Sequence, residues 1–131
     1  MECIQRVQMD EQTITDAFRK LYNTRQDLAQ ASEKTRMRRS ELEQERAARM
    51  MSGEIVGKNE AERNARAQEL LMRYFLAVDA ADLEERQMRL AHDLARIEVE
   101  RIDFLLRLMA VKASDANTAP KSASVTGRLA S

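Results

Sequence analysis

Apolar residues recur at every seventh position through the second half of the chain. One row consists of Leu76, Leu83, Leu90, Ile97, Phe104 and Val111, and a second row, of Ala80, Gln87, Leu94, Arg101 and Leu108, falls between its members. Spacings that alternate between three and four residues are typical of a coiled-coil helix. The pattern predicts a long helix over residues 59–112. Its predicted coiled-coil or oligomer core consists of Leu76, Leu83, Leu90, Leu94, Ile97, Phe104 and Leu108.

A weaker row at the same spacing runs through the first half of the chain and predicts a helix over residues 10–51. It consists of Val7, Ile14, Leu21, Leu28, Thr35 and Leu42. The positions between them hold small or polar side chains, namely Ala17, Thr24, Ala31 and Arg38. This face becomes more polar toward the middle of the chain. We therefore expect a hairpin that packs most tightly at its open end.

Residues 52–58, with the sequence SGEIVGK, separate the two predicted helices. Gly53 can take the left-handed conformation that ends a helix, and Gly57 permits a second reversal of the chain. Asn59 is a favoured N-cap residue, and Glu62 follows three positions later, as in a capping box. The segment therefore predicts a bend. Its Ile55 and Val56 form a candidate partner-binding surface, provided that they do not pack onto the helices.

Together these elements predict an all-α fold, a long antiparallel helical hairpin of the coiled-coil type. At 1.5 Å per residue the two helices are roughly 60 and 80 Å long. Two helices bury only one stripe each, so a lone hairpin of this size is marginal and we expect self-association. Residues 1–9 form a separate N-terminal segment. Residues 113–131 contain Pro120 and many Ser, Thr and Ala residues, so we expect a disordered tail there.

Composition and charge exclude several classes of function. The 131 residues include 22 basic and 22 acidic side chains, so the formal net charge is zero and no overall field attracts nucleic acid or an anionic membrane. No apolar run approaches the roughly 20 residues needed to span a bilayer, and the N-terminus lacks the apolar core of a secretory signal. With Cys3 as the single cysteine, no intramolecular disulfide can form, and we expect a cytoplasmic location.

The two glycines of the bend also raise the question of a phosphate-binding loop. Such a loop needs four residues between its glycines, and Ser or Thr after the lysine. Here three residues separate Gly53 from Gly57, and Asn59 follows Lys58. The single histidine, His92, has no histidine or glutamate at the spacing of a helical metal site. We therefore expect no catalytic, cofactor-binding or metal-binding residues, and a protein that is not an enzyme.

A basic cluster in the first helix is the remaining candidate site. It consists of Lys34, Arg36, Arg38, Arg39, Arg46 and Arg49, a pattern that suits contacts with a phosphate backbone. However, Glu41, Glu43 and Glu45 lie among these residues, and no aromatic side chain is interleaved for stacking on bases. The favoured interpretation is a solvated face or a surface for an acidic protein, and nucleic-acid binding is the alternative.

The turn V-G-K-N-E-A-E-R, from Val56 to Arg63, is followed by the long heptad helix. This combination resembles small coiled-coil proteins encoded by bacteriophages and prophages, in which a G-K-N-E-x-x-R turn opens the second helix. The resemblance implies a phage or bacterial setting, with the protein in the host cytoplasm, and implies no catalytic residues. The heptads, the balance of charge and the lack of a catalytic constellation favour a non-catalytic coiled-coil module that self-associates and binds another protein as an adaptor, scaffold or inhibitor. The alternative is a nucleic-acid-binding accessory protein of phage DNA metabolism.

Overall fold

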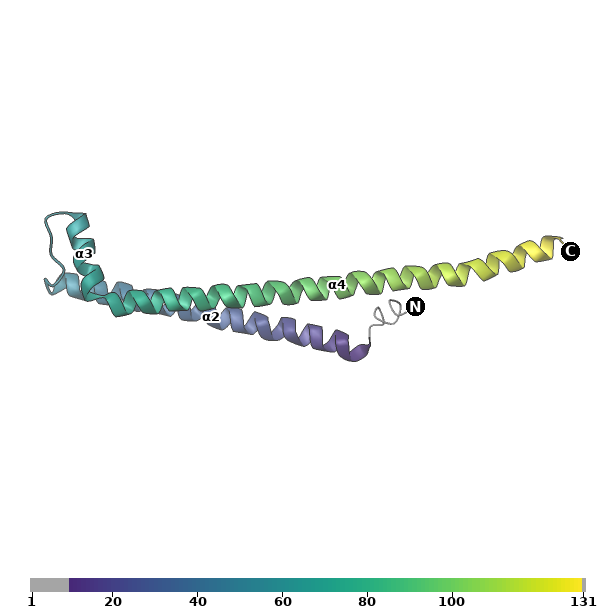
Figure 1. Cartoon of the computed structure of the whole chain (residues 1–131), viewed down its shortest axis with the longest axis horizontal. Helices are drawn as coiled ribbons and strands as arrows, with labels where there is room; N and C mark the ends of the chain where they lie inside the picture. Colours follow the sequence, from purple (N-terminus) through teal and green to yellow (C-terminus); the bar gives the residue numbers. More distant parts are fainter. Residues whose placement is uncertain (1–9, 131) are drawn as a thin grey trace. The chain divides into compact units, whose positions relative to one another are not determined.

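The protein is built from helices, and the described residues contain no strand (Figure 1). A computed structural model describes the backbone of residues 10–130 and the side chains of residues 10–116. Its helices are α2 (Glu11–Met51), α3 (Glu60–Leu70) and α4 (Met72–Ala130). The all-α prediction is confirmed, and α2 agrees with the predicted helix over residues 10–51 to within one residue. The predicted N-terminal segment, residues 1–9, lies outside the described residues.

The chain divides into two compact units. The bend unit is Tyr22–Asp93, and the terminal unit consists of Met1–Leu21 together with Leu94–Ser131. The bend unit contains the end of α2, the bend, α3 and the beginning of α4. The terminal unit contains the beginning of α2 and the remainder of α4.

The end of α2 follows from the backbone geometry of Gly53, which has a φ of +81°. The amide of Gly53 donates to the carbonyl of Met50 at 3.2 Å, and the amide of Glu54 donates to the carbonyl of Arg49 at 3.0 Å. This pair of bonds is the Schellman motif, which satisfies the last carbonyls of a helix. The Ser52 hydroxyl donates to the same Arg49 carbonyl at 3.0 Å. The predicted role of Gly53 is confirmed.

The start of α3 is fixed by Asn59, whose Oδ1 accepts the amide of Glu62 at 2.9 Å. The Glu62 carboxylate in turn accepts the amide of Lys58 at 2.8 Å, one residue earlier than in the usual capping box. Gly57 does not act as predicted, because its φ is not positive. A Cβ atom at Gly57 would instead lie 2.8 Å from Glu62 Cβ and 2.9 Å from the Arg63 amide nitrogen. Close approach of the backbone therefore requires glycine here.

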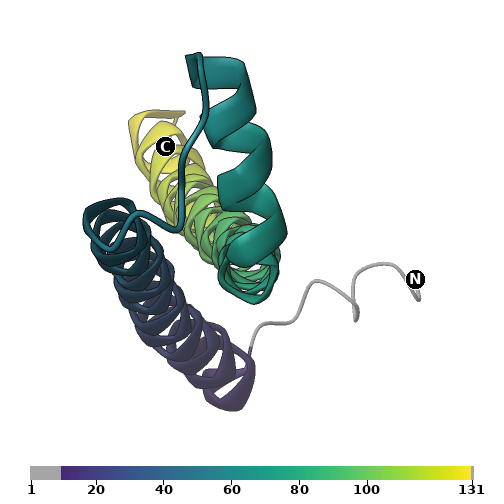
Figure 2. The ribbon, with the colours of Figure 1, turned by 90° about the vertical axis from the view of Figure 1, so that its left-hand side faces the viewer.

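The predicted second helix is interrupted at Leu71, where α3 ends and α4 begins (Figures 1 and 2). Leu71 has φ −110° and ψ 18° and is fully buried, although neither glycine nor proline marks the break. It forms a small core with Ile55 and Ala67. The partly buried side chains packed on this core are those of Leu42, Leu70, Tyr74 and Phe75. Burial of Leu71 and Ile55 together accounts for a break that helix propensity does not predict.

In the bend unit, α2 and α4 are packed together. The Ser32 hydroxyl donates to Glu85 at 2.9 Å, Lys34 to Glu84 at 3.0 Å, and Arg39 to Asp82 at 2.7 Å. The later α2 residues thus meet the earlier α4 residues. Between these polar contacts lie small buried side chains, with Ala31 and Thr35 on α2 and Ala81 on α4.

In the terminal unit, Ala95 and Ile102 of α4 are buried and Ile14, Ala17 and Leu21 of α2 are half-buried. The first helical turn is capped by Asp10, whose carboxylate accepts the amide of Thr13 at 2.7 Å. The backbone of α4 is helical through Ala130 and therefore includes most of the predicted tail, residues 113–131. The side chains of residues 106–116 are all exposed, so packing adds little to the stability of this stretch. Disorder of the tail in solution stays a prediction.

Leu71→Ala should lower the free energy of unfolding by about 2–5 kcal/mol, because it leaves a cavity beneath the bend. Urea denaturation followed by circular dichroism measures this change. The matched control is Met51→Ala, at a side chain that is 90% exposed, and it should change stability by less than about 0.5 kcal/mol. Equal effects of the two substitutions would contradict the position of Leu71 in the core.

Candidate functional site

The seven residues predicted as a coiled-coil core form an outward row on α4. In the bend unit, Leu76, Leu83 and Leu90 are 57–60% exposed. In the terminal unit, Leu94, Ile97, Phe104 and Leu108 are 40–66% exposed. These side chains do not form the core within one chain, which corrects that part of the prediction. Their role as the core of an oligomer stays a prediction.

A different face of α4 packs against α2. It repeats every seven residues, and its members in the bend unit are Tyr74, Val78, Ala81, Glu85, Met88 and His92. Its members in the terminal unit are Ala95, Val99 and Ile102, and all nine residues are buried or half-buried. This inward row lies roughly 130–150° round the helix from the outward row. The spacing of the inward row is visible in the sequence. Because the row includes small and polar side chains, it is less apolar than the outward row.

The physical reason for this choice of face is the composition of α2. The buried residues of α2 are Thr24, Ala31 and Thr35, at most 9% exposed, so the closest part of its contact with α4 in the bend unit is made of small side chains. Small side chains allow two helix backbones to approach closely, and Ala81 on α4 matches them. The Thr35 hydroxyl lies 3.1 Å from the Ala31 carbonyl and 3.2 Å from the Ala81 carbonyl, so its proton has an acceptor on either helix.

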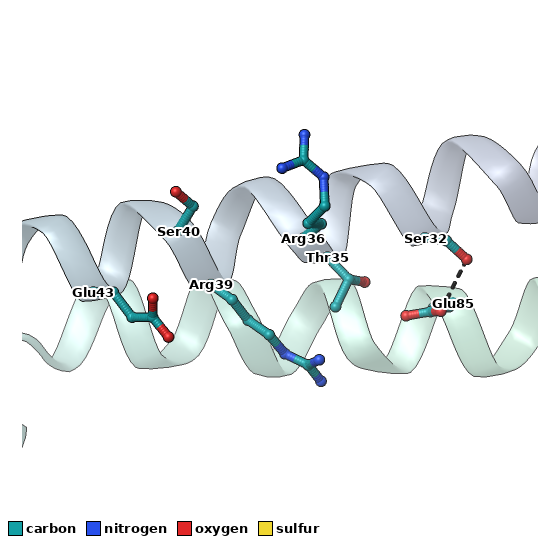
Figure 3. A pocket seen from close by; sticks show the side chains of 7 residues that line it. All are labelled: Ser32, Thr35, Arg36, Arg39, Ser40, Glu43 and Glu85. Atoms are coloured by element: carbon teal, nitrogen blue, oxygen red, sulfur yellow. Dashed lines mark hydrogen bonds between the residues drawn. The ribbon is translucent and has the colours of Figure 1, made fainter.

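A shallow groove of about 330 Å³ follows this contact between α2 and α4 (Figure 3). Its walls are Ser32, Thr35, Arg36, Arg39, Ser40, Glu43 and Glu85. In Figure 3 Ser32 points to Glu85, whereas Arg36 points away from α4. A hydrogen bond from Ser32 holds the pKa of Glu85 below its usual range, aided by the charges of Arg89 and Arg39. Glu85 is thus a carboxylate that holds the helices together.

The groove offers little to a ligand, since both its arginines and Glu85 are already paired. Arg39 binds Asp82 at 2.7 Å, and Glu85 also accepts a hydrogen bond from Arg89 at 3.1 Å. The remaining arginine, Arg36, is paired with Glu33 on its own helix. We therefore assign the groove a structural role, as a polar seam that fixes how α2 and α4 meet.

His92 belongs to the inward row rather than to the surface. Its Nε2 is buried and has no hydrogen-bond partner among the described residues, and its Nδ1 lies 4.0 Å from Asp93 Oδ1. Within the part of the chain that the structure describes, no group of three His, Cys, Asp or Glu side chains is placed to bind a metal. His92 therefore has the surroundings of a packing residue.

Five of the six residues of the basic cluster form ion pairs within the chain. Its ion pairs join Lys34 to Glu84, Arg36 to Glu33, Arg38 to Glu41, Arg39 to Asp82, and Arg49 to both Glu45 and Glu54. The sixth residue, Arg46, donates to the Asn64 side chain at 2.7 Å. A phosphate backbone would have to exchange these contacts for its own, and exposed ion pairs are individually weak. The alternative of nucleic-acid binding stays a prediction.

The bend differs from the predicted partner surface. Ile55 is 4% exposed because it packs into the core with Ala67 and Leu71, so the prediction that it contacts a partner is wrong for this structure. Val56, at 66% exposure, remains on the surface. Met50 and Met51 are 48% and 90% exposed at the end of α2. The exposed apolar surface of the bend is thus smaller than the outward row of α4.

Comparison of the chain with protein-family models, with curated proteins and with solved structures finds no match. The resemblance of residues 56–63 to phage-encoded coiled-coil proteins stays a prediction. Among the residues that the structure describes, no helix combines the length and apolar character needed to cross a membrane.

Ser32→Ala should destabilise the protein at pH 7 and lose this effect in acid. Because the folded-state pKa of Glu85 is lowered, its stabilisation is present above the ordinary glutamate pKa of about 4.3 and disappears as pH falls through the lower folded-state value. Unfolding by urea at pH 7 and at about pH 3 measures the difference from wild type. In the control, Ser40→Ala, the lost hydroxyl accepts from Gln44 at 3.3 Å, so its effect should not depend on pH. A pH-independent deficit for Ser32→Ala would contradict the role of Glu85.

Proposed function

We propose that the protein is a non-catalytic protein-interaction module that works as a self-associating antiparallel coiled-coil hairpin. In this proposal it serves as an adaptor, scaffold or inhibitor, and the phage-like turn at Val56–Arg63 favours the cytoplasm of a bacterial host. The observation that carries the proposal is the outward row of α4, whose apolar side chains are exposed in both units.

The energetics favour a protein partner for this row. Full burial of a leucine, isoleucine or phenylalanine side chain contributes roughly 1.5–3 kcal/mol, and the outward row offers seven such side chains. Soluble monomers rarely expose large contiguous apolar patches, and larger ones usually mark an interaction surface. The inward row is the less apolar of the two, since it includes Glu85 and His92. Association through the outward row therefore adds apolar burial beyond that of the contact within the chain.

The outward row also suits a helix better than a small molecule or a nucleic acid. Its seven-residue repeat matches the knobs-into-holes packing of a second helix. The groove between α2 and α4 is shallow and lined by polar side chains, and the basic cluster is paired internally. A helical protein surface is therefore the partner that the chemistry of the row fits.

Leu90→Asp should reduce the assembly to a monomer while leaving the helical content unchanged. Leu90 is 60% exposed, so the substitution leaves the chain's own packing intact but places a charge in the proposed interface. Light scattering should give a mass of at least twice 15.0 kDa for the wild type and about 15 kDa for the variant.

The control for Leu90→Asp is Ala110→Asp, an exposed position of α4 outside the outward row, which should assemble like the wild type. A wild-type protein that is monomeric at all concentrations would contradict self-association. Loss of helix in Leu90→Asp alone would instead place Leu90 in the core of the chain.

Nucleic acid should not bind the basic cluster. At low salt, where phosphate contacts are strongest, neither single- nor double-stranded DNA should change the fluorescence anisotropy of a labelled probe. If binding is observed, the double variant Lys34→Gln/Arg39→Gln tests whether these side chains carry it. Binding that weakens steeply with salt and disappears in that variant would overturn the preference for a protein partner.

A further inference from the structure

We propose that the outward row of α4 binds the outward row of a second copy of the chain in the opposite direction, with Leu90 of one copy against Leu94 of the other. The inference rests on the proposed self-association and adds the occupant, its direction and its register. It is carried by the charged residues that flank the row, because these residues determine which pairings are favourable in a coiled coil.

The flanking residues disfavour a parallel pair. Each residue of one flank lies three positions after Leu76, Leu83, Leu90, Ile97 or Phe104. In a parallel coiled coil, this residue lies beside the residue of the other helix whose number is five higher than its own. On α4 this juxtaposes Asp79 with Glu84, Asp93 with Glu98, and Arg107 with Lys112. Every charged pair is therefore repulsive, and each occurs twice in a symmetric dimer. No attractive pair offsets them.

Reversing one helix introduces attractive contacts that the parallel pair lacks. One flank of the row carries Asp79, Arg86, Asp93, Glu100 and Arg107, seven residues apart. In an antiparallel pair the same flank of the two helices meets. The series of charges on one helix therefore faces the same series in reverse order on the other. With Asp93 at the centre, Asp79 lies opposite Arg107 and Arg86 lies opposite Glu100. Only the central pair, Asp93 with its own copy, is repulsive.

The same register brings the large apolar side chains together. It places Leu76 against Leu108, Ala80 against Phe104, and Leu90 against Leu94 of the second copy. Two of these layers pair leucine with leucine, and in the third the small Ala80 leaves room for Phe104. Two layers contain a polar side chain, Leu83 with Arg101 and Gln87 with Ile97. Arg101 already pairs with Glu98, so its charged end can stay at the edge while its aliphatic stem covers Leu83.

The charges required on this flank are exposed in the single chain. Asp79 and Arg86 are exposed, and the side chains of Glu100 and Arg107 are 68% and 79% exposed. The ion pairs that Glu100 and Arg107 now make, with Arg96 and Asp103, are local ones on the same helix. Such exposed pairs are weak, so exchanging or sharing them with a second copy costs little.

The opposite flank is the side nearest α2, and its one repulsive contact is moderated. In the proposed register Glu84 lies opposite Glu98 of the second copy. Glu84 is paired with Lys34 at 3.0 Å, and Glu98 is paired with Arg101 at 2.6 Å, so a cation lies beside each carboxylate. Of the other positions of this flank, Ala77, Ala91 and Leu105 carry no charge, and Lys112 has no charged residue of α4 opposite it.

Cysteine cross-linking in a Cys3→Ser background tests direction and register together. Leu76→Cys and Leu108→Cys are made separately, and one is labelled with ¹⁵N so that mixed products are distinguishable by mass. The mixture should give a disulfide between the two variants, and neither variant alone should cross-link to itself. In the proposed pair the two copies of residue 76 are 32 positions apart along the helix axis, about 48 Å, far beyond the reach of a disulfide.

Charge reversal provides the second arm. Asp79→Arg and Arg107→Asp should each weaken the dimer about threefold to tenfold, and combining them should restore wild-type affinity. Light scattering of the cysteine variants before oxidation separates self-association from its direction and register. Monomers throughout would overturn self-association itself. A dimer in which each variant cross-links to itself would show a parallel pair, and a dimer with no cross-link in any mixture would show another register or face. Either result would overturn the present inference and leave self-association in place.

Discussion

The close contact of small side chains between α2 and α4 is the constraint on which the remaining structure depends. Thr35 is 2% exposed and reaches carbonyls on both helices, and Ala31 and Ala81 are buried beside it. A face of this kind cannot accommodate a row of leucines without separating the helices. The larger side chains of α4 are therefore left exposed. Internal packing and the proposed association thus use different faces of one helix.

The bend and α3 add a second contact within the bend unit. The Schellman motif at Gly53 ends α2, and the N-cap Asn59 begins α3 a few residues later. Ile55 lies between them and is buried. Leu71 then interrupts the second helix so that α3 covers Ile55 while the beginning of α4 packs against α2 (Figure 1). Hydrogen bonds to backbone groups determine where α2 ends and α3 begins. Burial of Leu71 determines the break between α3 and α4.

Much of this fold is predictable from the sequence because its signals are local. Heptad spacing predicts the helices, and the residue types of the bend predict its ends. The choice between two rows of α4 is not predictable in this way, since it depends on which face α2 can approach. The most apolar row is the natural candidate for an internal core, yet Leu83 and Leu90 lie exposed while Ala81 and Ala95 are buried. Ile55 escaped prediction for the same reason, because its burial depends on Ala67 and Leu71, which lie beyond the bend.

The turn from Gly57 to Arg63 has a consequence for ancestry, because three of its defined positions, Gly57, Asn59 and Arg63, have a local structural role. Gly57 leaves space for Glu62, and the Lys58 amide binds the Glu62 carboxylate. Asn59 caps the helix, and Arg63 donates to the Gly57 carbonyl at 3.3 Å. Unrelated chains that must make the same reversal into a helix would be selected for the same few residues. A shared G-K-N-E-x-x-R turn is therefore compatible with convergence as well as with common descent. Descent would have to be traced through the exposed row of α4, whose pattern the turn does not dictate.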